Sequence, residues 1–368
     1  MEVYIEKIVY GGYGLARNND KIIFVNNVLP KEKADIKVVK IRNKVLFAEP
    51  IEIIRKSNYR QDPVCDYFGL CGGCQLQHIK YSFQLKIKKE IFIESLDRIG
   101  KIKADFPVKI IPSITPYHYR NSANIKIKNS TLGFYKRESN ELVAVKNCKL
   151  FHPMLSSAFN KLNPAQIKRN GEMKITVNGN GKRYENVLNY VFRVSANSFF
   201  QINTFLINNM VEIVLKESSK FYKFADLYSG VGLFSIFLSG NGKKGIGVEI
   251  AESSFKDALF NLKHNNINEK YLKFYNYNVE NSVKIIERFK PEIVIIDPPR
   301  NGIEKNFCQK ILDFDFIKRI VYISCNPTTL ARDLKVMTKK FRIERSYLID
   351  MFPQTHHIES IVVLKNKM

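Results

Sequence analysis

The 368-residue sequence has no tryptophan, only six cysteines, and far fewer acidic than basic residues. It also has no run of about 20 apolar residues, so we expect no membrane span and no membrane partner. Its first residues, MEVYIEKIVYGGYG, lack the basic end and long apolar block of a secretion signal. We therefore expect a cytoplasmic protein whose cysteines stay reduced, so clustered cysteines need an explanation other than disulfides.

The charge of the chain is strongly unbalanced. The 59 Lys and Arg residues outnumber the 35 Asp and Glu residues, which gives a net charge of +24. This excess indicates a polyanionic partner, because each phosphate that a cation neutralises releases counterions. A basic surface that only keeps the protein in solution is the alternative, and we favour a nucleic acid.

The pattern along the chain predicts three regions. Residues 1–57 are short β-branched and aromatic segments separated by glycines, which is typical of a small barrel of about five strands. Lysines alternate with apolar residues there and suit RNA, unless that face is merely charged. Residues 58–198 contain clustered cysteines, an amphipathic helix over 79–100 and strand-rich stretches. Over 199–368 strands and helices alternate, which predicts a parallel, doubly wound α/β sheet.

The segment DLYSGVGLF places Gly230 and Gly232 in a turn between a strand and a helix. Such glycines let the backbone approach a ligand. A bare Gly-x-Gly does not identify the ligand, and NAD stays an alternative because Ser235 supplies a small third residue. Glu249 ends the next strand, where an acid can accept hydrogen bonds from ribose hydroxyls. Six polar side chains end strands at the same expected edge of the sheet: Asp226, Tyr228, Glu249, Asn278, Asp297 and Cys325. They predict a nucleoside site.

Cys325 follows the apolar run IVYIS and precedes Asn326 and Pro327. It is a small core residue, a metal ligand or a nucleophile, and its place at the strand end favours the nucleophile. A thiolate that adds to carbon 6 of uracil would let carbon 5 attack the methyl group of S-adenosylmethionine. Glu359, which follows His356 and His357, is the candidate base for the carbon 5 proton if burial raises its pKa.

Four other cysteines form a second group, Cys65-x5-Cys71-x2-Cys74 and the distant Cys148. Four thiolates can surround a metal, and zinc is the general candidate. An iron–sulfur cluster and reduced cysteines without a ligand are the alternatives. Cys308 lies in the helix-like run NFCQKIL and is predicted to be a packing residue.

Five stretches, SCNPTTLARDL, DPPRNG, FFQIN, DLYSGVGLF and FPQTHHIES, together resemble the RNA uracil-5-methyltransferases, which make 5-methyluridine in ribosomal or transfer RNA. The resemblance extends over essentially the whole chain, and residues 1–57 resemble a TRAM domain. It implies a class I, Rossmann-like methyltransferase domain over 199–368 with an N-terminal OB-like barrel. It also implies a β-rich iron–sulfur and RNA-binding domain over 58–198, from which residues 76–108 could depart to pack on the catalytic domain.

Carried over residue by residue, the resemblance implies Cys325 as the nucleophile and Glu359 as the proton-removing base. The implied contacts of S-adenosylmethionine are Gln201, Tyr228, Glu249, Asn278 and Asp297. The implied ligands of a 4Fe-4S cluster are Cys65, Cys71, Cys74 and Cys148. YRNSA at 119–123 is similar to an RNA-side motif. Leu233 stands where some members have a cofactor-binding Asn, so no side-chain role is assigned to it.

We predict a monomeric enzyme that methylates carbon 5 of a uridine, most simply in 23S ribosomal RNA. Transfer RNA is the alternative substrate, and a non-catalytic RNA-binding protein on a methyltransferase scaffold is the alternative function. An NAD-dependent enzyme leaves the nucleophile, the charge and the barrel unexplained. A stacked base hides carbon 6, so we expect a loop or an extruded nucleotide, with Phe199 or Phe200 as a stacking partner.

Overall fold

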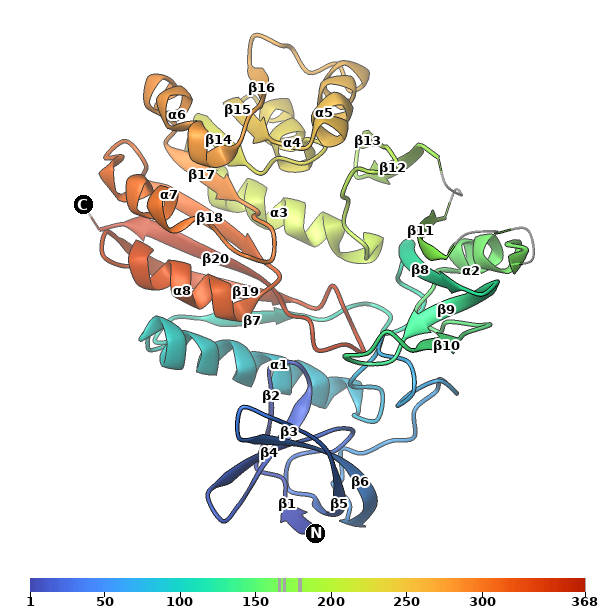
Figure 1. The fold of residues 1–368 in the computed structure, drawn as a ribbon. Coiled ribbons are helices and arrows are strands. Elements are labelled where there is room, and N and C mark those ends of the chain that lie inside the picture. Colours follow the sequence, from blue (N-terminus) through green and yellow to red (C-terminus); the bar gives the residue numbers. More distant parts are fainter. Residues whose placement is uncertain (165–166, 168–169, 178–180, 368) are drawn as a thin grey trace.

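The computed structural model describes residues 1–164, 167, 170–177 and 181–367. Of the strand-rich stretch predicted over 170–199, residues 178–180 therefore lie outside the described part. Figure 1 shows a small N-terminal barrel, one long helix above it, a large sheet above that helix, and a smaller sheet at the side. Among the described residues, no helix combines the length and apolar character needed to cross a membrane.

The N-terminal barrel has six strands, one more than the sequence suggested. In spatial order they are β1 (Glu2–Tyr4), β5 (Lys33–Arg42), β6 (Val45–Arg55), β4 (Lys21–Val25), β3 (Tyr13–Asn18) and β2 (Lys7–Val9). Strand β1 has only three residues, too few for an alternating pattern to be recognised. In β5, Ala34 and Ile36 point into the core while Lys33 and Lys37 stay exposed, as period-two alternation requires.

The side sheet has four strands in the order β10 (Leu142–Ala144), β9 (Thr131–Tyr135), β8 (Ser122–Lys128) and β11 (Gly171–Thr176). Helix α2 (Pro153–Asn160) packs on it through Leu155 and Phe159. A separate hairpin of β12 (Arg183–Val187) and β13 (Tyr190–Val194) leads toward the large sheet. The hairpin is fixed there because Asp257 and Asn261 of the next region bond its backbone and Arg193.

The large sheet has eight strands, and this α/β arrangement confirms the predicted fold class. In spatial order they are β16 (Leu272–Asn276), β15 (Lys244–Glu249), β14 (Lys223–Leu227), β17 (Ile293–Ile296), β18 (Arg319–Ser324), β20 (Glu359–Asn366), β19 (Phe341–Ile349) and β7 (Val108–Ile111). Two apolar clusters cover its two faces. The helices of this region are α3 (Ile207–Ser218), α4 (Leu233–Gly240), α5 (Glu252–His264), α6 (Val283–Phe289), α7 (Lys305–Lys310) and α8 (Pro327–Met337).

The sheet departs from the expected all-parallel arrangement at one end. Strand β20 runs antiparallel to both β18 and β19, and β7 comes from a segment far upstream. The chain order reverses at β14, which has β15 on one side and β17 on the other. In open α/β sheets ligands bind at such a switch point, beyond the carboxyl ends of the strands.

Helix α1 (Tyr81–Ser95) lies between the barrel and the large sheet (Figure 1) and ends in a π-helical turn over Leu96–Gly100. Its buried side chains Ile87, Ile91 and Phe92 belong to the same apolar cluster as α8. The amphipathic pattern over 79–100 is therefore explained by one face that packs on the large sheet's helices.

Candidate active site and cysteine pocket

The turn after β14 is shaped to receive a ligand. Tyr228, Gly230 and Gly232 all have positive φ, at 65°, 55° and 86°. A Cβ atom on Gly232 would lie 2.8 Å from the Phe274 ring, so only glycine fits there. A Cβ atom on Gly230 would have no atom of the described residues within 4 Å. The bare backbone at Gly230, next to the start of α4, lies at the sheet edge where a nucleoside can approach.

Glu249, at the end of β15, faces this turn. Its carboxylate accepts hydrogen bonds from the backbone N–H of Gly230, at 2.8 Å, and of Ala251, at 2.7 Å. These two bonds orient the carboxylate, and each oxygen keeps a lone pair for a further donor such as a ribose hydroxyl. Glu249 is therefore placed where the sequence predicted it.

Two further predicted cofactor residues, Tyr228 and Asn278, both bond Glu280. The Tyr228 hydroxyl donates to Glu280, at 2.9 Å, and Asn278 caps the short helix Val279–Asn281 by accepting from the Glu280 N–H. Gln201 is buried on another segment, where its carbonyl accepts from the Asn121 side chain at 3.0 Å. Tyr228 and Asn278 thus share Glu280 as a partner, and Gln201 is tied to the central region.

Two carboxyl groups at the centre of the sheet have raised pKa values. Burial raises the pKa of Asp297, at the end of β17, to about 7, and the charges of Asp226 and Glu249 add to the shift. Burial likewise raises the pKa of Asp226 to about 7, although two hydrogen bonds from Ser235 oppose this. A cation bound between these carboxylates would relieve their mutual repulsion, as the sulfonium group of S-adenosylmethionine can.

The antiparallel pairing of β18 and β20 brings Cys325 and Glu359 together. Ser324 is paired with Ser360, so Cys325 and Glu359 stand opposite each other one position further along. Glu359 is accordingly the neighbouring charge with the largest effect on the Cys325 thiol. Residues 34 positions apart in the sequence thus share one sheet end with Asp297 and Arg300.

The ionisation of this pair has identifiable causes. Burial raises the pKa of the Cys325 thiol to about 11, Glu359 and Asp297 raise it further, and Arg300 lowers it. Burial raises the pKa of Glu359 well above its usual range, again with Asp297 adding and Arg300 opposing. Arg300 has no role that its sequence position alone assigns, although its place after Asp297 and two prolines already puts it at this edge.

The two histidines before β20 are poor candidates for the base. Burial lowers the pKa of His356 to about 4 and that of His357 to about 2, and the nearby cations Lys88 and Arg300 contribute. The rings lie 4.2 Å apart, between the Tyr10 and Phe352 rings. A base with so low a pKa removes protons weakly, whereas the raised pKa of Glu359 suits proton removal near neutrality.

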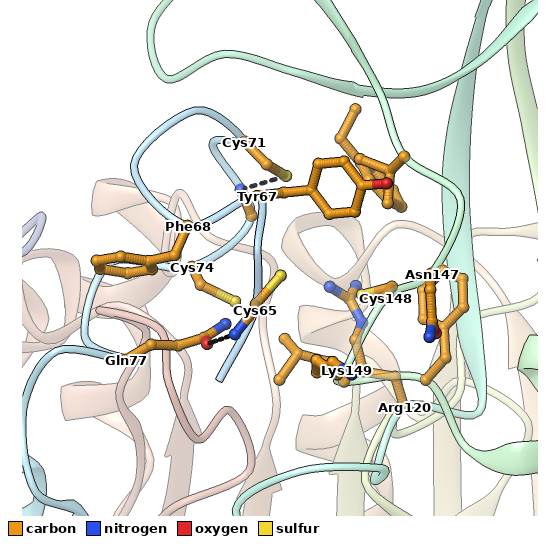
Figure 2. A pocket seen from close by; sticks show the side chains of 15 residues that line it. Cys65, Tyr67, Phe68, Cys71, Cys74, Gln77, Arg120, Asn147, Cys148 and Lys149 are labelled. Carbon is orange, nitrogen blue, oxygen red and sulfur yellow. Dashed lines mark hydrogen bonds between the residues drawn. The ribbon is translucent and has the colours of Figure 1, made fainter. Parts of the chain in front are cut away.

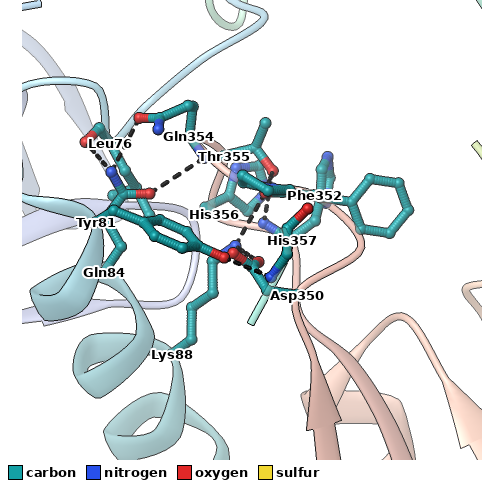
Figure 3. Close-up of polar contacts among 12 residues, drawn as sticks. Leu76, Tyr81, Gln84, Lys88, Asp350, Phe352, Gln354, Thr355, His356 and His357 are labelled. Carbon is teal, nitrogen blue, oxygen red and sulfur yellow. Dashed lines mark hydrogen bonds and ion pairs between the residues drawn. The ribbon is translucent and has the colours of Figure 1, made fainter. Parts of the chain in front are cut away.

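The loop that leads to Glu359 is held by helix α1 (Figure 3). The Lys88 ammonium lies 2.6 Å from Asp350 and donates to the Phe352 carbonyl at 2.9 Å. The Gln84 amide bonds Gln354 through both its oxygen and its nitrogen. Buried bonds from a distant helix therefore fix the loop. The family resemblance implied that residues 76–108 could pack on this region, but not which side chains would make the contact.

The four clustered cysteines line one pocket, together with apolar side chains that include Phe134 and Phe151. Figure 2 shows Cys65, Cys71 and Cys74 on one wall and Cys148 with Arg120 on another. Within the described residues, no three His, Cys, Asp or Glu side chains are close enough to hold a single metal ion. The structure thus brings the predicted ligands together around a space, without the compact geometry that one zinc ion needs.

Two buried polar atoms beside this pocket have no hydrogen-bond partner in the part of the chain that the structure describes. They are the Nε of Arg120 and the hydroxyl of Tyr117. Arg120 lowers the pKa values of Cys71 and Cys148, against burial, which raises that of Cys71 to about 11. The pocket encloses about 50 Å³, several times the ~10–15 Å³ that one water-sized group needs. Four thiols and the Arg120 side chain therefore line a space with room for a group larger than one ion.

Burial bears on three further predictions, for the two phenylalanines, the YRNSA stretch and Cys308. Phe200 is buried in the core beside Phe192, while Phe199 is 61% exposed, so only Phe199 is available for stacking. Tyr119 and Asn121 of the YRNSA stretch are buried. Tyr119 donates to a carbonyl of the loop before Glu359 and Asn121 donates to Gln201, so both position other segments rather than face RNA. Cys308 is buried, as a packing residue should be.

Comparison with known proteins gives two family matches. The tRNA (uracil-5-)-methyltransferase family matches residues 167–367, and the TRAM domain family matches residues 1–51. An uncharacterized RNA methyltransferase of Aquifex aeolicus is 34% identical, with 100% of this chain and 99% of that protein aligned. Another, from Clostridium acetobutylicum, is 30% identical over 99% of this chain and 96% of its own length.

A solved structure shares the whole fold. The tRNA (uracil-54, C5)-methyltransferase of Pyrococcus abyssi, solved with S-adenosyl-L-homocysteine, superimposes with a TM-score of 0.76. The likeness covers 99% of this chain and 100% of that one at 22% sequence identity. At that identity the likeness speaks for the architecture of barrel, side sheet and large sheet.

Proposed function

The chain belongs to the tRNA (uracil-5-)-methyltransferase family, and from this premise we propose that it methylates carbon 5 of one uridine in RNA through a covalent adduct at Cys325. Its class of activity is that of an RNA uracil-5-methyltransferase that uses S-adenosylmethionine. The observation that carries the covalent route is the pairing of Ser324 with Ser360, because it sets Cys325 against Glu359.

The proposed reaction begins with the thiolate. Arg300 is the cation that lowers the Cys325 pKa, so it favours the thiolate form. The sulfur adds to carbon 6 of the uracil, and the electron pair of the C5–C6 double bond moves toward carbon 5 and the 4-oxygen. Carbon 5 thereby becomes the nucleophile that an unmodified uracil lacks. S-adenosylmethionine, when bound, supplies the electrophilic methyl group.

The proposed reaction ends with proton removal. The Glu359 carboxylate takes the carbon 5 proton, the electron pair of that bond restores the C5–C6 double bond, and the sulfur leaves as thiolate. Burial and Asp297 make Glu359 a stronger base than an exposed carboxylate. We assign the contacts of S-adenosylmethionine to Gln201, Tyr228, Glu249, Asn278 and Asp297. The oriented Glu249 carboxylate and the open space above Gly230 support this cofactor assignment.

We also propose that Cys65, Cys71, Cys74 and Cys148 hold a 4Fe-4S cluster. The support is the common pocket and the unpaired Arg120 and Tyr117 atoms beside it. The cluster would join the segment around Cys74 to that around Cys148, 74 positions apart. The methylation chemistry needs no electron transfer, so the role assigned to the cluster is structural.

For the substrate we propose 23S ribosomal RNA, on the presence of both the barrel and the cysteine site. Transfer RNA is the second candidate, which the family match favours. The proposed division is a TRAM barrel over 1–57, an RNA-binding domain over 58–198 and a catalytic domain over 199–368. Helix α1 and β7, between residues 81 and 111, pack with the catalytic region.

The test uses the purified protein, tritium-labelled S-adenosylmethionine and total RNA from cells that lack the enzyme. The labelled RNA species is isolated and the methylated nucleotide is mapped. Label on carbon 5 of one uridine in 23S ribosomal RNA is expected. Label in transfer RNA would select the second candidate, and label on any other atom would refute the mechanism.

A further inference from the structure

The barrel reaches the active site through one tight turn. Tyr10, Gly11 and Gly12 join β2 to β3, and the two glycines have φ values of 100° and 79°. A Cβ atom on Gly12 would lie 2.9 Å from the Cβ of Gln75 and 3.3 Å from that of His356. The turn is thus packed so closely on the loop before Glu359 that a side chain has no room there.

The turn is also anchored from the central region. Arg137 donates to the Gly11 carbonyl and, at 2.8 Å, to Asn26 of the barrel. Its guanidinium also lies over the Tyr13 ring, 3.5 Å from the centroid. The position of Tyr10 is therefore fixed by contacts on both sides of the turn, and its ring meets the His356 ring edge-on at 5.7 Å.

The Tyr10 ring lies beside the loop that leads to Glu359, against the His356 ring. It is half-buried against the core of the large sheet. Burial raises the pKa of the Tyr10 hydroxyl, Cys325 and Glu359 raise it further, and Arg300 lowers it. Among the described residues the hydroxyl has no hydrogen-bond partner, whereas that of Tyr13, on the same hairpin, donates to Glu138 at 2.6 Å.

We infer that Tyr10 is a substrate-positioning residue, supplied to the active site by the RNA-binding barrel. Its hydroxyl donates a hydrogen bond to an oxygen of the target nucleotide beside Cys325 and Arg300. This inference rests on the proposed function. On this inference the barrel does more than attract RNA. Its β2–β3 hairpin also completes the site that holds the target base.

The test measures covalent adduct formation. The full-length protein, with S-adenosylmethionine, is mixed with total RNA from cells that lack the enzyme and were fed 5-fluorouracil. Fluorine on carbon 5 cannot be removed as a proton, so the adduct persists and is counted on a denaturing gel. Tyr10→Phe should slow adduct formation about tenfold, because it removes one hydrogen bond to the substrate. RNA affinity and melting temperature should stay at wild-type values.

The matched control is Tyr13→Phe, which removes a hydroxyl from the same hairpin but should leave the rate unchanged. A wild-type rate in Tyr10→Phe, with slowing only in Tyr10→Ala, would reduce Tyr10 to a packing residue and overturn the inference. Absence of adduct in the wild-type protein would overturn the proposed function itself. The two failures are therefore distinguishable.

Discussion

Cys325 and Cys71 have the same raised pKa, about 11, and burial is the main cause in both. Their surroundings differ. Cys325 faces two carboxyl groups, Glu359 and Asp297, whereas Cys71 faces other thiols, those of Cys148 and Cys65. Each has one arginine that favours its thiolate. Burial alone therefore does not assign a role to a cysteine, because the neighbouring groups differ in what they can do: a carboxylate can remove a proton, and further thiols can share a ligand.

The largest effects are expected when Cys325 or Glu359 is replaced at the end of the sheet. Cys325→Ala should lower turnover at least about a thousandfold, because the nucleophile is lost. Glu359→Gln should also block turnover but accumulate the RNA adduct, because proton removal follows addition. Turnover and adduct are measured on the same RNA. Retained turnover in Cys325→Ala would end the nucleophile assignment.

The second test removes one member of the cysteine pocket. Cys74→Ser should lose the iron and sulfide of the purified protein and destabilise it on the order of 5–10 kcal/mol, since the binding energy of a structural group is folding energy. Metal analysis and denaturant unfolding measure both effects. Cys308→Ala is the control and should keep the iron. Wild-type protein purified without oxygen and still lacking iron would contradict the cluster.

The third test concerns the loop between the two cysteine sites. Lys88→Met should cost about 3–5 kcal/mol of unfolding free energy, because the buried Asp350 carboxylate would lose its cationic partner. Lys7→Met, which breaks the partly exposed pair with Glu94, should cost less than about 1 kcal/mol. The Lys88 and Asp350 side chains are only 5% and 2% exposed. Equal losses of unfolding free energy in the two variants, measured in urea, would contradict a stabilising role for the buried Lys88–Asp350 pair.

The fourth test uses pH. His357 has a pKa of about 2, against an ordinary value of 6.5. Below pH 6.5 the unfolded chain therefore binds a proton that the native state excludes, and stability is lost as the pH falls. His357→Gln removes this loss, so it should gain about 2 kcal/mol relative to the wild type between pH 7 and pH 5. A constant difference across that range would show that His357 is protonated in the native state.

The smallest effect is expected at the exposed lysines of barrel strand β5. Lys37 is exposed on β5. Lys37→Ala should weaken RNA binding slightly and reduce the slope of log affinity against log salt by about 0.7–0.9, the value for one phosphate contact. Lys40→Ala should act in the same direction. Affinity for S-adenosylmethionine is the control, and an unaltered salt slope would exclude this face from RNA binding.

The secondary-structure elements, and the reactive side chains that they carry, could be predicted from the sequence. Alternating and helical periods are local, so the barrel strands, helix α1 and the alternation after residue 199 could be read from spacing. Polar residues such as Glu249, Asp297 and Cys325 follow apolar runs, and the ends of parallel strands meet at one edge. The candidate site was therefore predictable in its residues.

Which of these residues face each other could not be predicted in this way, because it depends on how distant segments pack. The antiparallel insertion of β20 beside β18 sets Glu359 against Cys325, and no local pattern encodes strand order. The same holds for Lys88 beneath the catalytic loop, for Arg120 at the cysteine pocket, and for Tyr10, which the barrel brings to the site. Contacts between segments far apart in sequence depend on packing of whole regions, and side-chain spacing within one segment carries no record of them.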